Sequence, residues 1–336
     1  MKRVVSLCSA LLLTPLFLAT AVADHHEEDG FISLFSGRSL KGWDGNPKFW
    51  SVQDGAITGI TTKDNPTKGN TFIIWRGGEV DNFELRLKFK IIGGNSGIQY
   101  RSKDRGNWVA SGYQGDFEAG TTYSGILYEE KGRGILAQRG QKTVVSAGTP
   151  KHKVTVVGSL GESAEIQEVI NQEDWNDYKI IARGYEFTHV INGRVTAEVT
   201  DLDKKNRASS GILALQLHAG PPMKVQFKDI RIRPLDGVNV AGNWDFKVET
   251  DQGTGEPSFK LTQKGNKLSG TYEGLLGTLP VTGSIEGSRV SLRVEGDYEG
   301  QTIVAKYSGK VTGFKSLEGT VNFNDQFDAT FTGTKD

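Results

Sequence analysis

The sequence predicts an all-β protein with two consecutive domains, a β-sandwich followed by a small β-barrel. Glycine accounts for 43 of the 336 residues and proline for only 9, which indicates many tight turns between short strands. Many segments alternate apolar and polar residues, as strands with one buried face do. Only one helix is predicted, near 163–171, where Ile166, Val169 and Ile170 share a face.

The charge balance limits the classes of partner. Lys and Arg total 40 and Asp and Glu total 40, so the formal net charge is zero. A nucleic-acid binder needs a basic surface that displaces counterions from phosphate, so no nucleic-acid partner is predicted. Aromatic residues reach 9%, which argues against a disordered chain.

Residues 1–23 have the pattern of a secretory signal peptide. The basic start Met1-Lys2-Arg3 precedes an apolar stretch, which ends in the cleavage motif Ala21-Val22-Ala23. A membrane anchor is the alternative, but it needs about 20 unbroken apolar residues, and polar residues and Pro15 interrupt this stretch. We expect cleavage after Ala23, a periplasmic or secreted protein, and no integral membrane segment after cleavage.

Cleavage would also remove Cys8, the one cysteine of the chain. The mature protein would then contain no disulfide, no cysteine nucleophile and no cysteine-bound zinc. Residues 24–29 (DHHEED) follow as a charged linker. His25 and His26 could chelate a metal there, but a solvated linker is the simpler interpretation.

The first domain is predicted over residues 30–236. Asn192-Gly193 is typical of a two-residue hairpin turn between two alternating segments. Several short strands with almost no helix predict a β-sandwich or jelly roll. The clearest strand segments are Ile73–Trp75, Phe83–Phe89, Ser96–Tyr100, Tyr178–Ala182, Phe187–Ile191, Gly211–Leu217 and Val225–Ile232.

The second domain is predicted over residues 240–336. Short alternating segments separated by glycine turns indicate about eight strands, which suits a small meandering, lipocalin-like β-barrel. Its carboxylates are scattered, and no chemistry is predicted for it. The strand segments are Trp244–Val248, Phe259–Leu261, Lys267–Tyr272, Arg289–Val294, Thr302–Tyr307, Ser316–Phe323 and Phe327–Thr332.

Three strands of the first domain carry polar side chains at every second position. Because of the β-pleat, such residues share one face of a strand. The residues predicted to share a face are Gln99 with Arg101, Gln114 with Asp116 and Glu118, and Gln216 with His218. Planar amides, a guanidinium and carboxylates on one sheet suit the hydroxyl groups of a sugar. An ordinary polar outer face is the alternative.

Asp116, Glu118 and His218 are the candidate catalytic residues. The two carboxylates lie about 7 Å apart along one strand, and either could act as acid or base on a glycosidic bond. Jelly-roll glucanases carry a Glu-x-Asp-x-x-Glu strand, but Gln114 occupies the first position here. Glutamine cannot be a nucleophile, which argues against an ordinary retaining glucanase. His218 is the plausible base at neutral pH.

Two other regions are interpreted with alternatives. Tyr128-Glu129-Glu130 with Arg133-Gly134 is a dense polar loop that either closes over the sheet or forms a salt-bridged turn. His189 alternates with Phe187 and Ile191, which favours a core position bonded to backbone. No Gly-x-Ser-x-Gly, phosphate-loop or His-Glu-x-x-His motif occurs in the sequence.

The order of several short motifs resembles the 3-keto-disaccharide hydrolase domain family, long known as a domain of unknown function. The motifs begin at residues 30–43 (GFISLFSGRSLKGW) and continue with 95–101 (NSGIQYR), 112–116 (GYQGD), 174–176 (DWN), 192–193 (NG), 215–218 (LQLH) and 225–230 (VQFKDI). Together they cover about 200 residues, 30–235. The resemblance implies a concanavalin A-like jelly roll that acts on 3-keto-glycosides.

The implied chemistry starts from the ketone at sugar C3, which acidifies the proton at C2. A base removes that proton, the C1 substituent is expelled, and water adds back. We hypothesise His218 or Asp116 as base, Glu118 as leaving-group acid, and Arg101 with Gln99 stabilising the enolate. A divalent cation held by Asp116, Glu118 and His218 could take over that stabilisation, and no other cofactor is predicted. Further substrate contacts are predicted for Gln114, Gln216 and Tyr128.

A non-catalytic, lectin-like carbohydrate-binding envelope protein is the rival interpretation, because one fold hosts many functions. In that case Asp116, Glu118 and His218 only hydrogen-bond to the glycan. A third interpretation is an envelope protein with two interaction domains. Replacing the carboxylates distinguishes the first two, since it abolishes either turnover or only affinity.

Overall fold

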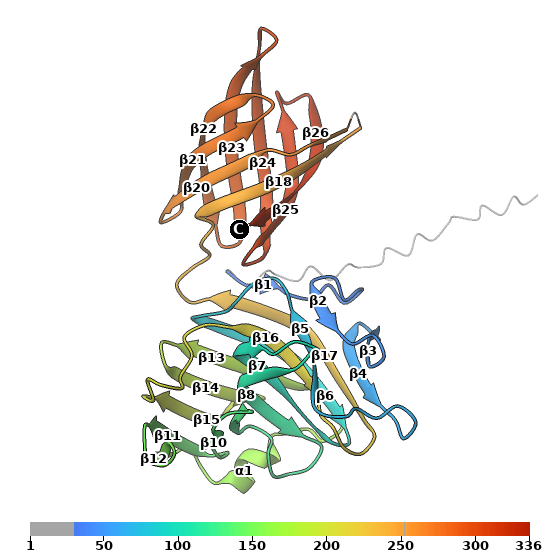
Figure 1. Ribbon diagram of the computed structural model, residues 1–336, viewed down its shortest axis with the longest axis vertical. Coiled ribbons are helices and arrows are strands. Elements are labelled where there is room, and N and C mark those ends of the chain that lie inside the picture. The colour runs from blue at the N-terminus through green and yellow to red at the C-terminus, as the bar shows by residue number, and fades with distance from the viewer. Residues whose placement is uncertain (1–29, 252) are drawn as a thin grey trace, which may run out of the picture.

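A computed structural model describes residues 30–251 and 253–336, which form three β-sheets and one short helix (Figure 1). The predicted all-β class is confirmed. The predicted signal peptide, residues 1–23, and the charged linker, 24–29, lie outside the described residues. Within the described ranges, no helix is long and apolar enough to cross a membrane.

Between residues 30 and 234 the structure has seventeen strands and one helix. In chain order they are β1 Ile32–Ser33, β2 Trp43–Gly45, β3 Trp50–Gln53, β4 Ala56–Thr61, β5 Thr71–Trp75, β6 Phe83–Ile92, β7 Asn95–Asp104, β8 Ala110–Glu118, β9 Leu127–Glu130, β10 Gly134–Ala137, β11 Gln141–Ser146, β12 Lys153–Ser159, α1 Ser163–Glu168, β13 Asn176–Arg183, β14 Glu186–Ile191, β15 Arg194–Asp201, β16 Ile212–Leu217 and β17 Met223–Pro234.

These strands form two sheets that pack face to face. The ten-stranded sheet has the order β12-β11-β15-β14-β13-β6-β17-β4-β3, with β1 paired to β17. The seven-stranded sheet has the order β10-β9-β8-β7-β16-β5-β2. Phe89 of the first sheet and Phe117 of the second lie 4.0 Å apart between ring centroids, and both are buried. The predicted β-sandwich is therefore confirmed.

The remaining strands form a barrel in which each strand pairs with its neighbour in sequence, apart from the short β19 at its edge. They are β18 Gly242–Thr250, β19 Gly253–Gly255, β20 Ser258–Lys264, β21 Lys267–Gly274, β22 Gly277–Glu286, β23 Arg289–Tyr298, β24 Gln301–Gly313, β25 Ser316–Phe323 and β26 Phe327–Lys335. Pairing of β18 with β26 closes the barrel. The predicted meandering barrel is confirmed, whereas the independence of the two parts as domains stays a prediction.

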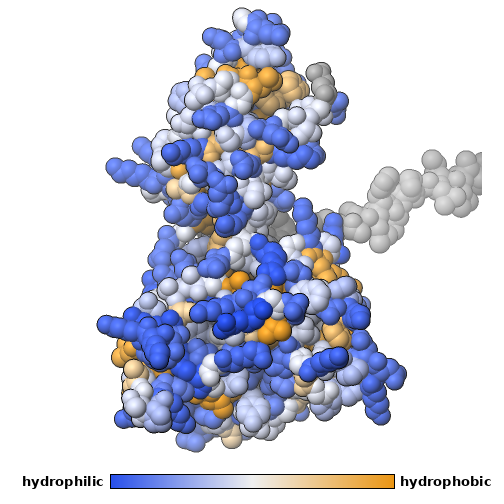
Figure 2. Space-filling view, viewed as in Figure 1, coloured by the Kyte–Doolittle hydropathy of each residue, from blue (hydrophilic) through white to orange (hydrophobic). Residues whose placement is uncertain are grey.

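The sandwich and the barrel touch through a small contact. Phe314 of the β24–β25 turn meets Trp75 of β5 edge to face, with ring centroids 5.7 Å apart. The backbone N–H of Lys315 donates to the carbonyl of Gly77 at 3.2 Å. On the face of the molecule shown in Figure 2, polar side chains predominate and apolar ones form separate small groups.

Candidate functional site

The outer side of the seven-stranded sheet carries a row of polar side chains, which we call the polar face: Gln99, Gln114, Asp116, Glu130 and Gln216. Alternation places them there, because their neighbours Tyr113 and Phe117 point into the core. Gln99 of β7 lies opposite Gln114 of β8 in register. The three predicted polar strands are neighbours, in the order β8-β7-β16.

A chain of side-chain amides runs along the polar face. The Ser102 hydroxyl donates to Gln99 Oε1, and Gln99 Nε2 donates to Gln114 Oε1 at 2.7 Å. Gln114 Nε2 in turn donates to Asp116 Oδ1 at 3.1 Å. Gln99 and Gln114 are fully buried or nearly so. Each amide is therefore fixed in one orientation, with the Asp116 carboxyl at the end of the chain.

A second carboxylate, that of Glu130, reaches the same row from β9. Gln216 Nε2 donates to Gln114 Oε1 at 3.1 Å and approaches Glu130 Oε2 at 3.5 Å. Asn70 Nδ2 lies 3.3 and 3.4 Å from the two Glu130 oxygens. Gln216 Oε1 is buried and accepts no hydrogen bond from the described residues, so it is an unsatisfied acceptor of the polar face.

Burial dominates the electrostatics of Asp116. Its side chain is 6% exposed, and this desolvation raises its pKa to about 8, against the opposing hydrogen bonds from Gln114 and Asn95. The charges of Glu118 and Glu130 raise it further. Asp116 can therefore exchange a proton near neutral pH.

Tyr128, a predicted substrate contact, lies beside the polar face. It lies opposite Gln114 in the β8–β9 register and is half-buried. Burial, followed by the charges of Glu130 and Asp116, raises the pKa of its hydroxyl. Tyr128 therefore keeps its proton and can donate a hydrogen bond to a ligand.

His218 lies at the edge of the polar face. Its ring Nδ1 contacts the carbonyl of Ala219, and the backbone N–H of Ala219 donates to Asn70 Oδ1 at 3.1 Å. Asn70 also reaches Glu130. His218 is half-buried. Hydrogen bonds through Ala219 and Asn70 connect it to Glu130 of the polar face.

The prediction that Arg101 shares a face with Gln99 is wrong. The register of β7 shifts after Tyr100, and Arg101 has a φ of 46°, so a β-bulge reverses its direction. Its guanidinium lies 5.4 Å from the centroid of the buried Phe187 ring and donates to the carbonyl of Asp81 at 2.7 Å. Arg101 therefore holds the core and neighbouring loops together.

Glu118 shapes the loop that follows β8. Its Oε1 accepts hydrogen bonds from the backbone N–H groups of Thr122 at 2.6 Å and Tyr123 at 3.0 Å. Within residues 30–251 and 253–336, no three His, Cys, Asp or Glu side chains are grouped as a metal site. The structure therefore does not bring Asp116, Glu118 and His218 together as cation ligands.

The segment 128–134 is not a loop that closes over the sheet: it belongs to the hairpin of β9 and β10 at the edge of the seven-stranded sheet, and its turn is salt-bridged. Glu129 points inward and pairs with Arg133 Nε at 2.7 Å, while Arg133 Nη2 lies 2.6 Å from the buried Asp201. Glu130, one residue further, points to the polar face. The sequence does not distinguish Glu129 from Glu130, because both belong to one polar segment.

Asn70 and Asn95 were not predicted as site residues. Asn70 comes from the loop before β5, and Asn95 begins β7. Sheet pairing places Asn95 opposite Glu118, and a side-chain hydrogen bond joins Asn70 to Ala219, the residue after His218. No local pattern marks such a contact. The one available signal was the polar Gly-Asn sequence before each strand.

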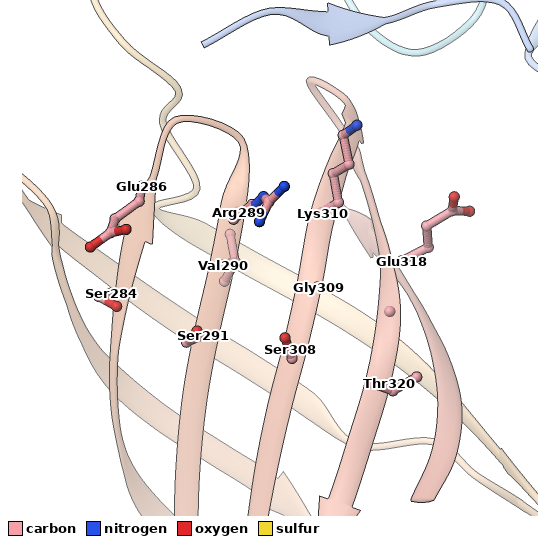
Figure 3. Close-up of a pocket in the computed structure, with 11 residues that line it drawn as sticks. Ser284, Glu286, Arg289, Val290, Ser291, Ser308, Gly309, Lys310, Glu318 and Thr320 are labelled. Atoms are coloured by element: carbon pink, nitrogen blue, oxygen red, sulfur yellow. The ribbon is translucent and has the colours of Figure 1, made fainter. Parts of the chain in front are cut away.

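The barrel carries a separate hollow of about 610 Å³ on its outer side (Figure 3). A row of hydroxyls crosses four paired strands, and a row of charged side chains runs beside it. The hydroxyl row is Ser284, Ser291, Ser308 and Thr320, and the charged row is Glu286, Arg289, Lys310 and Glu318. None of the predicted site residues lines this hollow.

The comparison with protein families gives one match. Residues 30–233 match the model of the 3-keto-alpha-glucoside-1,2-lyase-like domain. This range ends one residue before the end of β17, so it covers both sheets of the sandwich and leaves out the barrel. All residues of the polar face lie within it.

Single proteins give weaker likenesses. A 3-keto-disaccharide hydrolase of Bacteroides thetaiotaomicron is 33% identical over 90 residues, which are 23% of this chain and 29% of that protein. A candidate glycosyl hydrolase from Parabacteroides distasonis superposes with a TM-score of 0.41 at 19% identity, covering 61% of this chain and 99% of the other. For the carbohydrate-binding module CBM66 from Bacillus subtilis, the TM-score is 0.38 at 14% identity, with 57% and 95% covered.

Proposed function

Because the chain belongs to the 3-keto-alpha-glucoside-1,2-lyase-like domain family, we propose that it cleaves the glycosidic bond of 3-keto-glycosides or 3-keto-disaccharides. The family suggests a glycoside hydrolase-like or carbohydrate-binding protein. That the substrate carries a 3-keto group is the more specific part of the proposal. One observation carries it: Asp116 is a buried carboxyl with a pKa raised to about 8, held at the end of an amide chain beside Glu130. A proton-transfer group of this kind suits chemistry at an acidified C–H bond.

The proposed reaction begins at C2 of the 3-keto sugar. A base takes the C2 proton, the electron pair forms the C1–C2 double bond, and the C1–O bond breaks. The departing oxygen takes a proton and leaves as an alcohol or second sugar. Water then adds across the double bond, with its oxygen on C1 and its proton on C2, which restores a 3-keto sugar.

Asp116 is proposed to remove the C2 proton, and Glu130 to protonate the departing oxygen. Glu130 replaces Glu118 in this role because the Glu118 carboxylate holds the backbone of residues 122 and 123. His218 stays the second candidate base, since it is half-buried at the rim of the same face.

The amides are proposed to orient the sugar. Gln216 Oε1 has no hydrogen-bond partner and would accept a hydrogen bond from a sugar hydroxyl. Tyr128, which keeps its proton, would donate to the ketone or enolate oxygen. Gln99 and Gln114 lie behind these groups and fix their positions.

The test is incubation with 3-keto-trehalose and 3-keto-glucosides, with released sugar as the measurement. Asp116→Asn and Glu130→Gln are each expected to lower the rate by about 10²- to 10⁴-fold, the usual contribution of acid–base catalysis. Glu249→Gln is the control, because Glu249 is an exposed carboxylate on the barrel. Full activity in Asp116→Asn would overturn the assignment.

Running the reaction in deuterated water tests the elimination step. Deuterium at C2 of the product is expected, because the proton lost to the base is replaced from solvent. A product without deuterium at C2 would favour direct hydrolysis. Glycan binding without turnover of any 3-keto substrate would favour the carbohydrate-binding alternative.

We also propose that the protein is exported to the periplasm or beyond after cleavage following Ala23. The basis is the pattern of residues 1–23. Fractionation of the producing cells and N-terminal sequencing test it. A mature protein that begins at Asp24 is expected, and an intact Met1 in the cytoplasmic fraction would contradict it.

A further inference from the structure

The outer side of the ten-stranded sheet carries an excess of positive charge on three adjacent strands, β13, β6 and β17. On β6, alternation places Leu85, Leu87, Phe89 and Ile91 in the core. The side chains between them point outward, and three of these are cationic: Arg86, Lys88 and Lys90. Only one outward side chain of this strand, Glu84, is acidic.

The two flanking strands continue this pattern. On β17, Lys224, Lys228, Arg231 and Arg233 point outward, with Asp229 in the bulge between the middle two. On β13, Lys179 and Arg183 point outward beside Asp177. We call these nine cationic side chains the basic face. With three acidic residues among them, the net charge of this face is six positive, and Glu186 at the start of β14 lowers it by one.

Two of the three acidic residues on these strands, Glu84 and Asp177, form ion pairs with cations of the face. Glu84 pairs with Arg86 and with Arg233, both at 2.6 Å, and Asp177 pairs with Lys88 at 2.7 Å. Lys90, Lys179 and Lys224 have no carboxylate partner among the described residues. Their ammonium groups are left with like charges on adjacent strands, and a polyanion would relieve that repulsion.

The basic face is also hollowed. A groove of about 390 Å³ runs between β17, β6 and β13, and its charged lining is four cations and two carboxylates: Arg86, Lys88, Lys179, Arg231, Asp177 and Asp229. Gly193, in the turn between β14 and β15, also lines the groove. A chain-like anion could therefore lie along the groove with its charges over the cations.

We propose that the basic face binds an anionic polysaccharide. Each pair of neighbouring strands is about 4.8 Å apart, so a chain that crosses them meets a cation on every strand. A lipid surface is a poorer partner, because membrane-bound surfaces insert apolar side chains, and Ile92, at 41% exposed, is the one large apolar side chain exposed on these three strands.

The basic face and the polar face lie on opposite sides of the sandwich, because one is the outer side of the ten-stranded sheet and the other that of the seven-stranded sheet. An anionic glycan could therefore be held on one side while the other side stays open to substrate. This inference does not depend on the proposed enzymatic activity, since binding is measured without turnover.

Affinity for polygalacturonate, measured by titration calorimetry at several salt concentrations, is the test. Binding is expected to weaken as salt rises, because counterions are released from the polyanion. The triple variant Lys90→Glu, Lys179→Glu and Lys224→Glu is expected to bind about tenfold or more weakly, with a smaller salt dependence. Its melting temperature should stay unchanged, because none of the three lysines is ion-paired.

The matched control reverses three exposed barrel lysines, Lys260, Lys264 and Lys267, and so has the same net charge. It should bind like the unmodified protein, and equal weakening in both variants would overturn the proposal. Dextran sulfate distinguishes sulfated from carboxylated chains, and neutral dextran should not bind. Tighter binding to anionic phospholipid vesicles or to duplex DNA would also overturn it, in favour of those partners.

Discussion

Gln114 Nε2 donates a hydrogen bond to Asp116 Oδ1 at 3.1 Å, although the two residues belong to one strand. The bond is possible because Gln114 turns over Gly97 of the neighbouring strand. A Cβ at Gly97 would lie 2.4 Å from Gln114 Cγ. A glycine on β7 therefore determines where an amide on β8 holds the carboxyl group.

Replacing this glycine is expected to impair the site more than the fold. In Gly97→Ala the new methyl group displaces Gln114, so Asp116 loses its hydrogen-bond donor and the rate of sugar release should fall by about tenfold or more. Gly69→Ala is the control, because no atom lies within 4 Å of its added Cβ. Equal rates in the two variants would show that Gln114 does not position Asp116.

The contribution of Asp116 to the stability of the protein should decrease as pH rises from acid to neutral. Its pKa is about 8 in the folded protein and 3.8 in the reference state, so between these values the folded state holds a proton that the unfolded chain has released. The stabilisation is complete below about pH 4 and is lost as pH rises through 8.

Asp116→Asn removes this dependence. The variant should gain on the order of a few kcal/mol relative to the unmodified protein between pH 5 and pH 9, as measured by urea unfolding at both pH values. The exposed Asp177 serves as a control through Asp177→Asn. If Asp116→Asn kept the same loss of stability between the two pH values, another group would be responsible.

His189 is expected to stay neutral throughout the physiological range. It is fully buried between the hydroxyls of Tyr100 at 3.0 Å and Tyr178 at 3.2 Å, and burial lowers its pKa to about 3. The unfolded chain takes up this proton near pH 6.5, so His189 stabilises the fold above that value and the contribution is lost as pH falls towards 3. An NMR titration should show no change of its ring signals between pH 5 and 8, whereas a midpoint near 6.5 would contradict its buried position.

Arg133 should be among the most sensitive positions for stability. Its guanidinium neutralises Glu129 and Asp201, and all three side chains are less than a tenth exposed. Arg133→Met removes the cation from three buried carboxylates, Glu129, Asp201 and Asp203, which should cost about 3–5 kcal/mol in urea unfolding. Arg76→Met breaks a comparable pair of ion pairs at the surface and should cost about 1 kcal/mol or less. Similar losses in both variants would contradict this role.

The sequence was sufficient for features that depend on local periodicity. Gln99, Gln114, Asp116 and Gln216 were expected on polar strand faces, because the β-pleat alone decides which side chains share a side. The glycine turns likewise predicted the short strands of both the sandwich and the barrel. Asn192-Gly193 predicted one hairpin within the sandwich.

Features that break the period or join distant segments were not predictable. A β-bulge after Tyr100 directs the Arg101 side chain toward the core. The loop after β8 folds back, so that its backbone N–H groups hydrogen-bond to the Glu118 carboxylate. Glu130 and Asn70 meet although they are 60 residues apart, because sheet pairing rather than sequence brings them together. The sequence showed only that both residues are polar.

The position of β17 has a consequence for synthesis of the chain. It is the last strand of the sandwich to leave the ribosome, yet it lies inside the ten-stranded sheet between β6 and β4. Until residue 234 has emerged, those two strands have no partner on that side. The same holds for the barrel, because its last strand, β26, pairs with its first strand, β18. Each half of a nascent chain therefore stays incomplete until its final strand arrives.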